Sequence, residues 1–327
     1  MNRRRSLRLL AACERPRHGH GMVSFRMPTI CPILPRIAGR DQRQRYDGGD
    51  LPDDAVALAR PTNGGASSDD SPASRTDYYS PMDLLLEAFD TQLRRQPRWP
   101  GVEFADRVIR IVGEAWAGVL WSDLDEETAD AIIAREVAHF GARPEWEWKY
   151  YSYDEPSDLP DRLRAAGFVP EEQETLLVGR VEAMPTSRPL PGGVTLVSVD
   201  DPIGIERFLR ISDEVFGERS DAFGRELLAD IRAGRAAAVV AMADDRPISG
   251  GRIEFYQGTD FAGLYGGATV PDWRGRGVFR AIVAYRTALA GTRGFRYLQT
   301  DASEDSRPIF LRMGFTAIAT TTPFIHP

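Results

Sequence analysis

The pattern of apolar and polar positions divides the chain near residue 80. Before that point no period is sustained, and the segment is rich in Arg, Pro, Gly, Ser and Asp. A segment of this composition cannot bury enough apolar surface to offset the entropy cost of ordering it. We therefore expect residues 1–81 to form a disordered tail and linker.

From Met82 onward, segments with helical spacing alternate with short apolar or alternating segments that are typical of strands. The amphipathic run at 82–93 predicts the first helix. This alternation predicts an α/β protein with a mixed sheet. Strands are predicted at 107–114, 117–124, 146–153, 174–181, 193–199, 236–243, 248–256, 262–270, 295–301 and 315–325, and further helices at 126–141, 158–166, 202–216, 222–233, from about residue 277, and at 306–312.

The second part of the chain repeats features of the first at an offset of 147 residues. Each copy reads as a strand, an acidic turn, a short helix, Gly-Phe and another strand, so the repeated positions are those that define the ends of elements. We infer two related halves, at 82–185 and 186–327. The identical pairs are Tyr150 and Tyr297, Asp154 and Asp301, Asp158 and Asp305, Gly167 and Gly314, and Phe168 and Phe315.

Composition excludes several classes of site. Both cysteines, Cys13 and Cys31, lie in the tail, which excludes a disulfide-stapled core and fits a reducing compartment. His139 is the only histidine in a predicted element, so we expect no metal site and no histidine-dependent triad. The apolar run at 7–12 is too short for a signal peptide, and no later run approaches a membrane span. We expect a cytoplasmic protein without a membrane partner.

Charge is distributed unevenly along the chain. Residues 1–46 hold eleven arginines and two acids, whereas residues 82–327 hold 28 basic and 39 acidic side chains. The folded part is therefore acidic, and we expect it not to bind nucleic acid. A nucleic-acid-binding role for the basic tail is a weaker alternative.

A glycine-arginine turn, Arg274-Gly275-Arg276-Gly277, separates the strand predicted at 262–270 from the next helix. Glycines let backbone N–H groups approach a ligand, and the first helical turn offers unsatisfied donors with the positive end of the helix dipole. The spacing is neither that of a Walker loop nor GxGxxG. Because a diphosphate would gain charge-assisted hydrogen bonds here, we expect a phosphorylated cofactor. The alternative is an ordinary strand-to-helix turn with solvated arginines.

The stretch ATVPDWRGRGVFRAIV resembles the acyl-CoA-binding signature of the GNAT N-acetyltransferase superfamily, written Q/R-x-x-G-x-G/A, and YLQTDASEDSRPIFLRMGF resembles its fifth strand, fourth helix and Gly-Phe ending. The resemblance covers about Leu190 to Pro327. It implies a GNAT-like acyl-CoA-binding fold that takes acetyl-CoA, with the pyrophosphate on the turn and the pantetheine arm along the preceding strand. Residues 82–185 look like a degenerate copy without the cofactor turn, as in tandem members of that family. The cofactor-binding residues that it implies are Ala268, Thr269, Val270, Arg274, Gly275, Arg276, Gly277, Val278 and Phe279.

Three positions depart from the family pattern. Phe279 stands at the sixth signature position in place of Gly or Ala. Phe310 stands where many members keep a tyrosine that protonates the departing thiolate, and Ser303 stands where an asparagine is common. The usual general acid is therefore missing.

The candidate catalytic residues are Glu254, Tyr265 and Ser303. Glu254 and Tyr265 fall on the strands before the turn and are candidate bases for deprotonating an amine, while Ser303 and Asp301 fall at the end of the strand predicted at 295–301. Structural roles stay open for Glu254, Tyr265 and Asp301, and a water chain could act as the base.

Two functions follow from these patterns. The first is an acetyl-CoA-dependent N-acetyltransferase that acts on an amine of a small molecule or peptide, as a monomer or homodimer. The alternative is a CoA-binding regulatory module that does no chemistry, which Phe310 and the degenerate first half favour.

Overall fold

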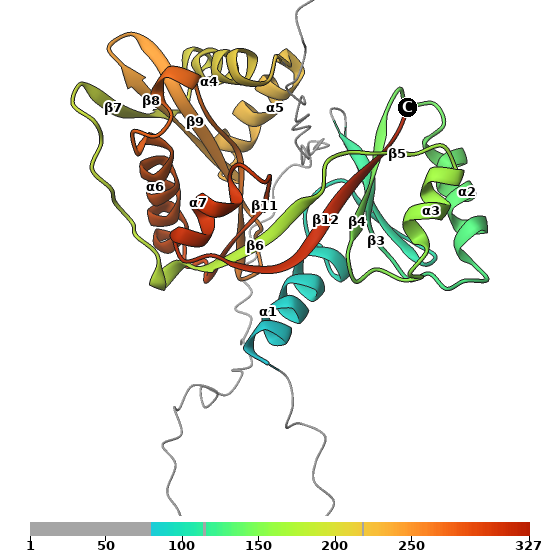
Figure 1. Cartoon of the computed structure of the whole chain (residues 1–327). Coiled ribbons are helices and arrows are strands. Elements are labelled where there is room, and N and C mark those ends of the chain that lie inside the picture. Colours follow the sequence, from blue (N-terminus) through green and yellow to red (C-terminus); the bar gives the residue numbers. More distant parts are fainter. Residues whose placement is uncertain (1–79, 114–115, 218) are drawn as a thin grey trace, which may run out of the picture.

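The computed structural model describes residues 80–113, 116–217 and 219–327. Its strands form one mixed sheet in the order β1-β2-β3-β4-β12-β6-β11-β10-β9-β8-β7, with β5 paired to β12 (Figure 1). The strands are β1 (Val102–Ala105), β2 (Val108–Val112), β3 (Ala117–Ser122), β4 (Trp146–Tyr151), β5 (Val169–Pro170), β6 (Glu174–Arg180), β7 (Val194–Val199), β8 (Ala236–Ala243), β9 (Arg246–Phe255), β10 (Phe261–Thr269), β11 (Tyr297–Ala302) and β12 (Thr316–His326).

The centre of the sheet interleaves strands from distant parts of the sequence. β6 pairs antiparallel with β11 on one side and with β12 on the other, and β12 continues into an antiparallel pairing with β4. Figure 1 shows β12 leaving the side that carries α7 and running to the side that carries α2 and α3, where the chain ends. The last strand of each half therefore completes the sheet beside a strand of the other half.

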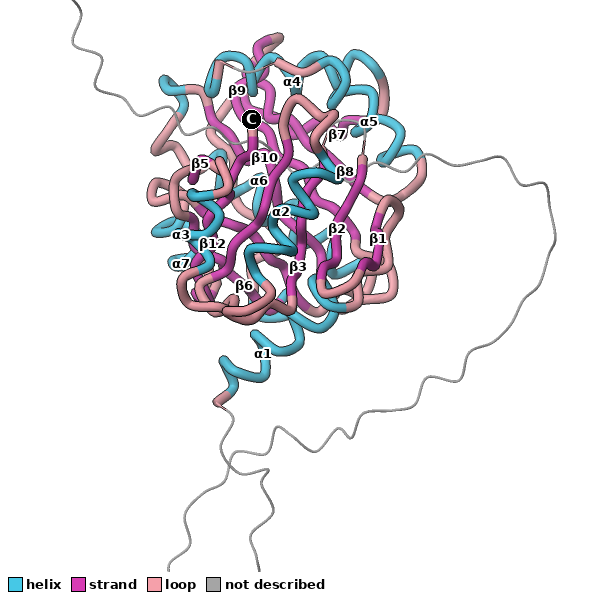
Figure 2. The backbone as a smooth tube through the Cα atoms, turned by 90° about the vertical axis from the view of Figure 1, so that its right-hand side faces the viewer, coloured by secondary structure: helices cyan, strands magenta, loops and turns pink. Residues whose placement is uncertain are grey.

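The helices cover both faces of the sheet. Consecutive residues of a strand point to opposite faces: a Cβ atom on Gly250 would meet Phe208 of α4, whereas one on Gly251 would meet Arg286 of α6. Helices α4 and α6 therefore lie on opposite faces, and Figure 2 shows α1 projecting from one end of the strands. The helices are α1 (Pro81–Phe89), the π-helix η2 (Asp90–Arg95), α2 (Ala129–Phe140), α3 (Leu159–Ala165), the 3-10 turn η3 (Val181–Ala183), α4 (Pro202–Phe216), α5 (Asp221–Arg232), the 3-10 turn η4 (Pro271–Trp273), α6 (Val278–Thr292) and α7 (Arg307–Arg312).

The predicted helices and the strands longer than four residues are confirmed. Helix α4 and strand β8 have the predicted bounds, and α1 begins one residue early, at Pro81, because Ser80 and Asp83 form a capping box. Strands β1 and β5 were not predicted, since they are short and β1 exposes Phe104. The expected disorder of the tail concerns residues that lie outside the described ones, apart from Ser80 and Pro81.

No helix in the described ranges combines the length and apolar character that a membrane crossing requires. The cytoplasmic location and the monomeric or dimeric state stay predictions.

Candidate functional site

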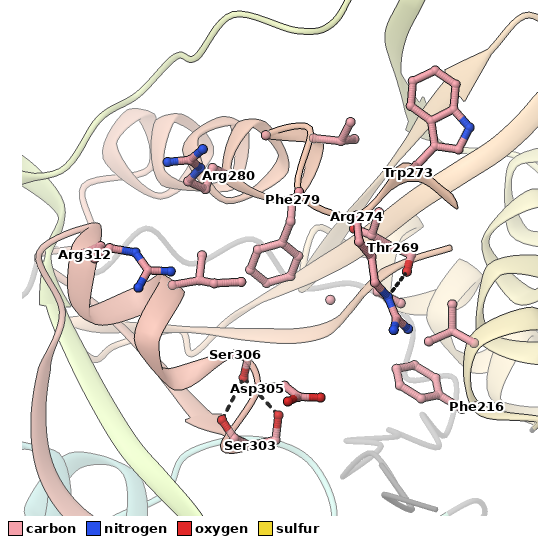
Figure 3. Close-up of a pocket in the computed structure, with 17 residues that line it drawn as sticks. Phe216, Thr269, Trp273, Arg274, Phe279, Arg280, Ser303, Asp305, Ser306 and Arg312 are labelled. Atoms are coloured by element: carbon pink, nitrogen blue, oxygen red, sulfur yellow. Dashed lines mark hydrogen bonds between the residues drawn. The ribbon is translucent and has the colours of Figure 1, made fainter. Parts of the chain in front are cut away.

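A cavity of about 970 Å³ opens where the end of β10 meets the N-terminus of α6 and helix α7 (Figure 3). Its volume is typical of a site for a cofactor or a large small-molecule ligand. The cavity is lined by Val215, Phe216, Gly267, Ala268, Thr269, Trp273, Arg274, Gly275, Gly277, Val278, Phe279, Arg280, Ser303, Asp305, Ser306, Ile309 and Arg312.

Strands β10 and β11 separate as they approach the cavity. They pair in parallel only from Phe261 to Gly263, and beyond this point the Thr300 hydroxyl donates to the Leu264 carbonyl at 2.9 Å. β10 also breaks its register with β9 between Tyr265 and Ala268, which is the signature of a β-bulge. The last residues of β10 therefore have an edge that faces the cavity and not another strand.

One residue of this edge directs its peptide groups into the opening. The Val270 amide donates to Ile248 of β9, so Val270 faces β9. Because peptide directions alternate along a strand, Ala268 also faces β9 and Thr269 faces the opening. The Ser249 hydroxyl donates to the Ala268 carbonyl, and Arg274 Nε donates to the Thr269 carbonyl at 3.1 Å (Figure 3).

The start of α6 offers unpaired amides. Gly277 precedes the helix with φ +88° and no side chain caps it. The first amide after Gly277 that finds a carbonyl is that of Ala281, while the Trp273 and Arg274 amides are used by the preceding turn. Among the described residues, the amides from Gly275 to Arg280 thus have no partner, and together with the helix dipole they favour an anion.

Three arginines add positive charge to the cavity wall. Arg274 comes from the turn, Arg280 from the first turn of α6 and Arg312 from the end of α7, and none of the three forms a salt bridge within the described chain. Asp305 is the one carboxylate among the lining residues. The cavity is therefore positively charged in a chain whose formal net charge is -7.

Phe279 and Phe310 form an aromatic wall. Their rings meet edge to face with centroids 5.6 Å apart, and Phe310 packs in the same way on Phe315 at 4.9 Å. Phe310 is buried, whereas Phe279 is half-buried and its ring points into the cavity (Figure 3). No hydroxyl stands at residue 310 to protonate a leaving group.

The three candidate catalytic residues do not lie together. Ser303 lines the cavity, 3.2 Å from the Ser306 hydroxyl. Glu254 and Tyr265 do not line it and lie on the face of the sheet that carries α4 and α5, where Arg252 bonds Glu254 Oε1 at 2.8 Å and stacks over the Tyr265 ring. The Tyr265 hydroxyl is 2.5 Å from that of Tyr256.

Burial raises the pKa of both residues. It raises the pKa of Glu254, partly offset by the charge of Arg252, and Glu254 Oε2 has no hydrogen-bond partner in the described chain. Burial and the nearby Glu254 charge also raise the pKa of Tyr265. Tyr265 therefore stays protonated at neutral pH, which favours Glu254 over Tyr265 as a proton acceptor.

Most of the predicted cofactor residues surround the cavity. The exceptions are Val270, which is fully buried, and Arg276, whose guanidinium stacks on Trp273 at 4.7 Å. Sequence reasoning missed Arg280 and Arg312, because a helical arginine is usually a solvated surface residue. The predicted residues that line the cavity are Ala268, Thr269, Arg274, Gly275, Gly277, Val278, Phe279 and Ser303.

The segment that builds this cavity has a recognisable family pattern. Residues 205–315 match the acetyltransferase (GNAT) family. The match includes every residue that lines the cavity. No curated protein matches the chain.

Solved structures resemble a larger part of the chain. A GCN5-related N-acetyltransferase from Kribbella flavida superposes with a TM-score of 0.55 and 18% identity, over 75% of this chain and 95% of that one. A functionally unknown conserved protein from Staphylococcus epidermidis ATCC 12228 superposes with a TM-score of 0.51 and 14% identity, over 73% and 96%. At these identities the likeness shows a shared fold, a mixed α/β architecture with a mixed sheet.

Proposed function

We propose that this protein is an acetyl-CoA-dependent N-acetyltransferase that acts on an amine of a small molecule or peptide. The observation that carries the proposal is the meeting, in one cavity, of unpaired amides at Gly275 to Arg280 with the edge of β10 at Thr269, which no other strand covers. The match of residues 205–315 to the acetyltransferase (GNAT) family supports an acyl-CoA as the ligand of this cavity.

The residues of the cavity fit an acyl-CoA. The amides at the start of α6, with Arg274, Arg280 and Arg312 nearby, would hold its phosphates. The edge of β10 at Thr269 would hold the extended arm, since a strand edge binds an extended chain through main-chain hydrogen bonds. Bound there, acetyl-CoA supplies a thioester as the acyl donor.

The chain's own residues then position the acceptor and move its proton. Glu254 does not line the cavity, but it has a raised pKa and an Oε2 without a partner in the described chain, and it accepts the amine proton through water. Tyr265 remains protonated and keeps Tyr256 and Gln299 in place through its hydroxyl. Since the side chain of Phe310 has no acidic proton to donate, the departing thiolate needs stabilisation from another group.

A charge-reversing variant in the turn tests cofactor binding. Gly277→Glu places a carboxylate at the start of α6, and we expect calorimetry to show at least a tenfold loss of acetyl-CoA affinity. Gly234→Glu is the matched control, because Gly234 also has a positive φ (+73°), has open space around its Cβ position and lies outside the cavity. Equal affinities in wild type and Gly277→Glu would contradict the proposal.

A second candidate function is a CoA-binding module that performs no chemistry, which the aromatic Phe310 favours. Release of free thiol from acetyl-CoA across a panel of amines distinguishes the two. Sustained release above the hydrolysis background supports the transferase, and binding without release supports the module.

We also propose that residues 82–185 and 186–327 are related copies, the first without the cofactor turn. The strand order supports this, because the central strands β4-β12-β6-β11 are arranged symmetrically: β4 corresponds to β11, and β12 corresponds to β6. Along the chain, α3 follows β4 as α7 follows β11. A structure-based comparison of the two halves in relatives that retain both cofactor turns tests the relation.

A further inference from the structure

Arg286 of α6 lies inside the molecule, directly behind the wall of the cavity. Its side chain is 1% exposed, and its Nη1 donates to the carbonyls of Arg252 at 2.8 Å and Tyr265 at 3.3 Å. These two residues face each other across β9 and β10, at the point where the bulge begins. The guanidinium therefore joins β9 and β10 where the bulge begins.

Two glycines make room for this guanidinium. A Cβ atom on Gly251 would lie 2.7 Å from Arg286 Cζ, and one on Gly267 would lie 3.7 Å from Nη2. Gly267 lines the cavity, so Nη2 lies close behind the part of the cavity wall that Gly267 and the Phe279 ring form. The site is built around the arginine from three elements, α6, β9 and β10.

Among the described residues, the charge of Arg286 has no counter-ion. Nη2 has no hydrogen-bond partner, and no carboxylate of the described residues forms a salt bridge with the group. Burial, together with the positive charge of Arg252, lowers the pKa of Arg286 to about 9. An unpaired buried cation is costly, so its presence points to an anion that arrives with the ligand.

We propose that Arg286 is a positioning residue for acyl transfer: it holds the β10 bulge and, through the wall at Gly267, stabilises the thiolate that leaves during the reaction. This inference rests on the proposed transferase function. The acceptor nitrogen forms a bond to the acyl carbon, the carbon–sulfur bond breaks, and its electron pair leaves on sulfur. The amine proton goes to the base, and the thiolate departs as an anion that solvent protonates later. Arg286 thereby stabilises the leaving thiolate by its charge, whereas a tyrosine at residue 310 would protonate it.

The test is the ionisation of CoA bound to the protein, followed by the ultraviolet absorbance of its thiolate as a function of pH. We expect the bound thiol in wild type and in Arg286→Lys to have a pKa about one unit lower than in Arg286→Met, because a nearby cation in a water-poor wall favours the ionised form of the thiol. If Arg286 had only a structural role, Arg286→Met would change the affinity for CoA but not the pKa of the bound thiol. Equal thiol pKa values in wild type and Arg286→Met, with CoA bound to both, would overturn the inference and leave the proposed function standing.

A measurement on wild type alone covers the case in which Arg286→Met fails to fold. We compare the affinities of CoA and of desulfo-CoA, in which hydrogen replaces the thiol, between about pH 7 and 8.5, the range below the ordinary thiol pKa. The preference for CoA should rise with pH, as the bound thiol ionises before the free one. A constant ratio would overturn the inference, whereas failure of both ligands to bind would remove the proposed function and the inference with it.

Discussion

The ring of Phe279 lies against the backbone of Gly267, so that a Cβ atom at residue 267 would come within 2.7 Å of Phe279 Cε2. The large ring in the first turn of α6 is therefore accommodated by the absence of a side chain on the free edge of β10. Because Gly267 and Phe279 both line the cavity, this contact sets its width.

We expect Gly267→Ala to weaken acetyl-CoA binding about tenfold, since the new methyl pushes the Phe279 ring into the cavity, and overpacking of this kind typically costs about 1–3 kcal/mol. Titration calorimetry measures the effect. Adding Phe279→Ala to Gly267→Ala should restore most of the affinity, because the ring that the methyl displaces is gone.

The matched control for this prediction is Gly192→Ala, since a Cβ atom at Gly192 would meet nothing within 4 Å. It should bind acetyl-CoA as wild type does. If the double variant binds no better than Gly267→Ala, the ring of Phe279 does not transmit the effect and the prediction fails.

Local structure could be predicted from the sequence, because caps, turns and periodicity are short-range signals. Asp201 caps α4 through the Gly204 amide, and the Gly277 turn precedes α6 as the sequence predicts. The insertion of β6 between β11 and β12 could not be predicted, because an apolar strand such as Glu174–Arg180 pairs equally well with many edges. Arg286 was missed for a related reason, since only the packing shows that its side chain points inward and finds no carboxylate.

We expect Glu254→Gln to lower kcat about 100-fold, the lower end of what a general base contributes, while leaving the acetyl-CoA affinity unchanged. Burial raises the pKa of Glu254 above its ordinary value, so wild-type kcat/KM should fall as the pH drops through that raised pKa, where the carboxylate becomes protonated. Steady-state kinetics from mildly acidic to neutral pH measure both effects, and the acid limb should vanish in the variant.

Glu206→Gln is the control, because Glu206 is an exposed carboxylate of α4 that pairs with Arg219 away from the cavity. It should change neither kcat nor the pH profile. Wild-type kcat in Glu254→Gln would assign proton transfer to another group, such as a water chain.

Lys149, the only lysine of the chain, connects three strands at the centre of the sheet. Its Nζ lies 3.1 Å from Glu174 on β6 and 3.4 Å from Asp301 on β11, and each of the three side chains is about 15% exposed. We expect Lys149→Met to lower the free energy of unfolding at pH 7 by about 3 kcal/mol, because it leaves the carboxylates unpaired in a largely buried place. Urea unfolding measures the loss, and Lys149→Arg, which keeps the charge, should lose much less.

The free energy of unfolding lost in Lys149→Met should depend on pH. Burial lowers the pKa of Lys149, but the charges of these carboxylates outweigh it and the pKa is raised, so the stabilising effect of Lys149 is complete below the ordinary lysine pKa and is lost only as the pH rises through the raised value. At acid pH the difference between wild type and Lys149→Met should shrink, because burial raises the pKa of Glu174 and its protonation removes one unpaired charge. Arg164→Met, which breaks an exposed pair with Asp161, should cost at most about 0.5 kcal/mol and serves as the control.

Because β6 pairs with β11 and β12 pairs with β4, we predict that residues 186–327 do not fold stably alone, although they contain the whole cavity. β6 lies outside this fragment, so β11 would lose its antiparallel partner and β12 would lose both β6 and β4. Exposed apolar edges of this kind favour aggregation over a defined fold.

We expect the fragment 186–327 to show no cooperative thermal transition by circular dichroism, whereas 80–327 melts cooperatively. Co-expression of a separate 80–185 fragment should restore the transition, because it supplies β4 and β6 without a covalent link. A fragment 186–327 that melts like 80–327 would mean that β11 and β12 pair with each other once β6 is gone.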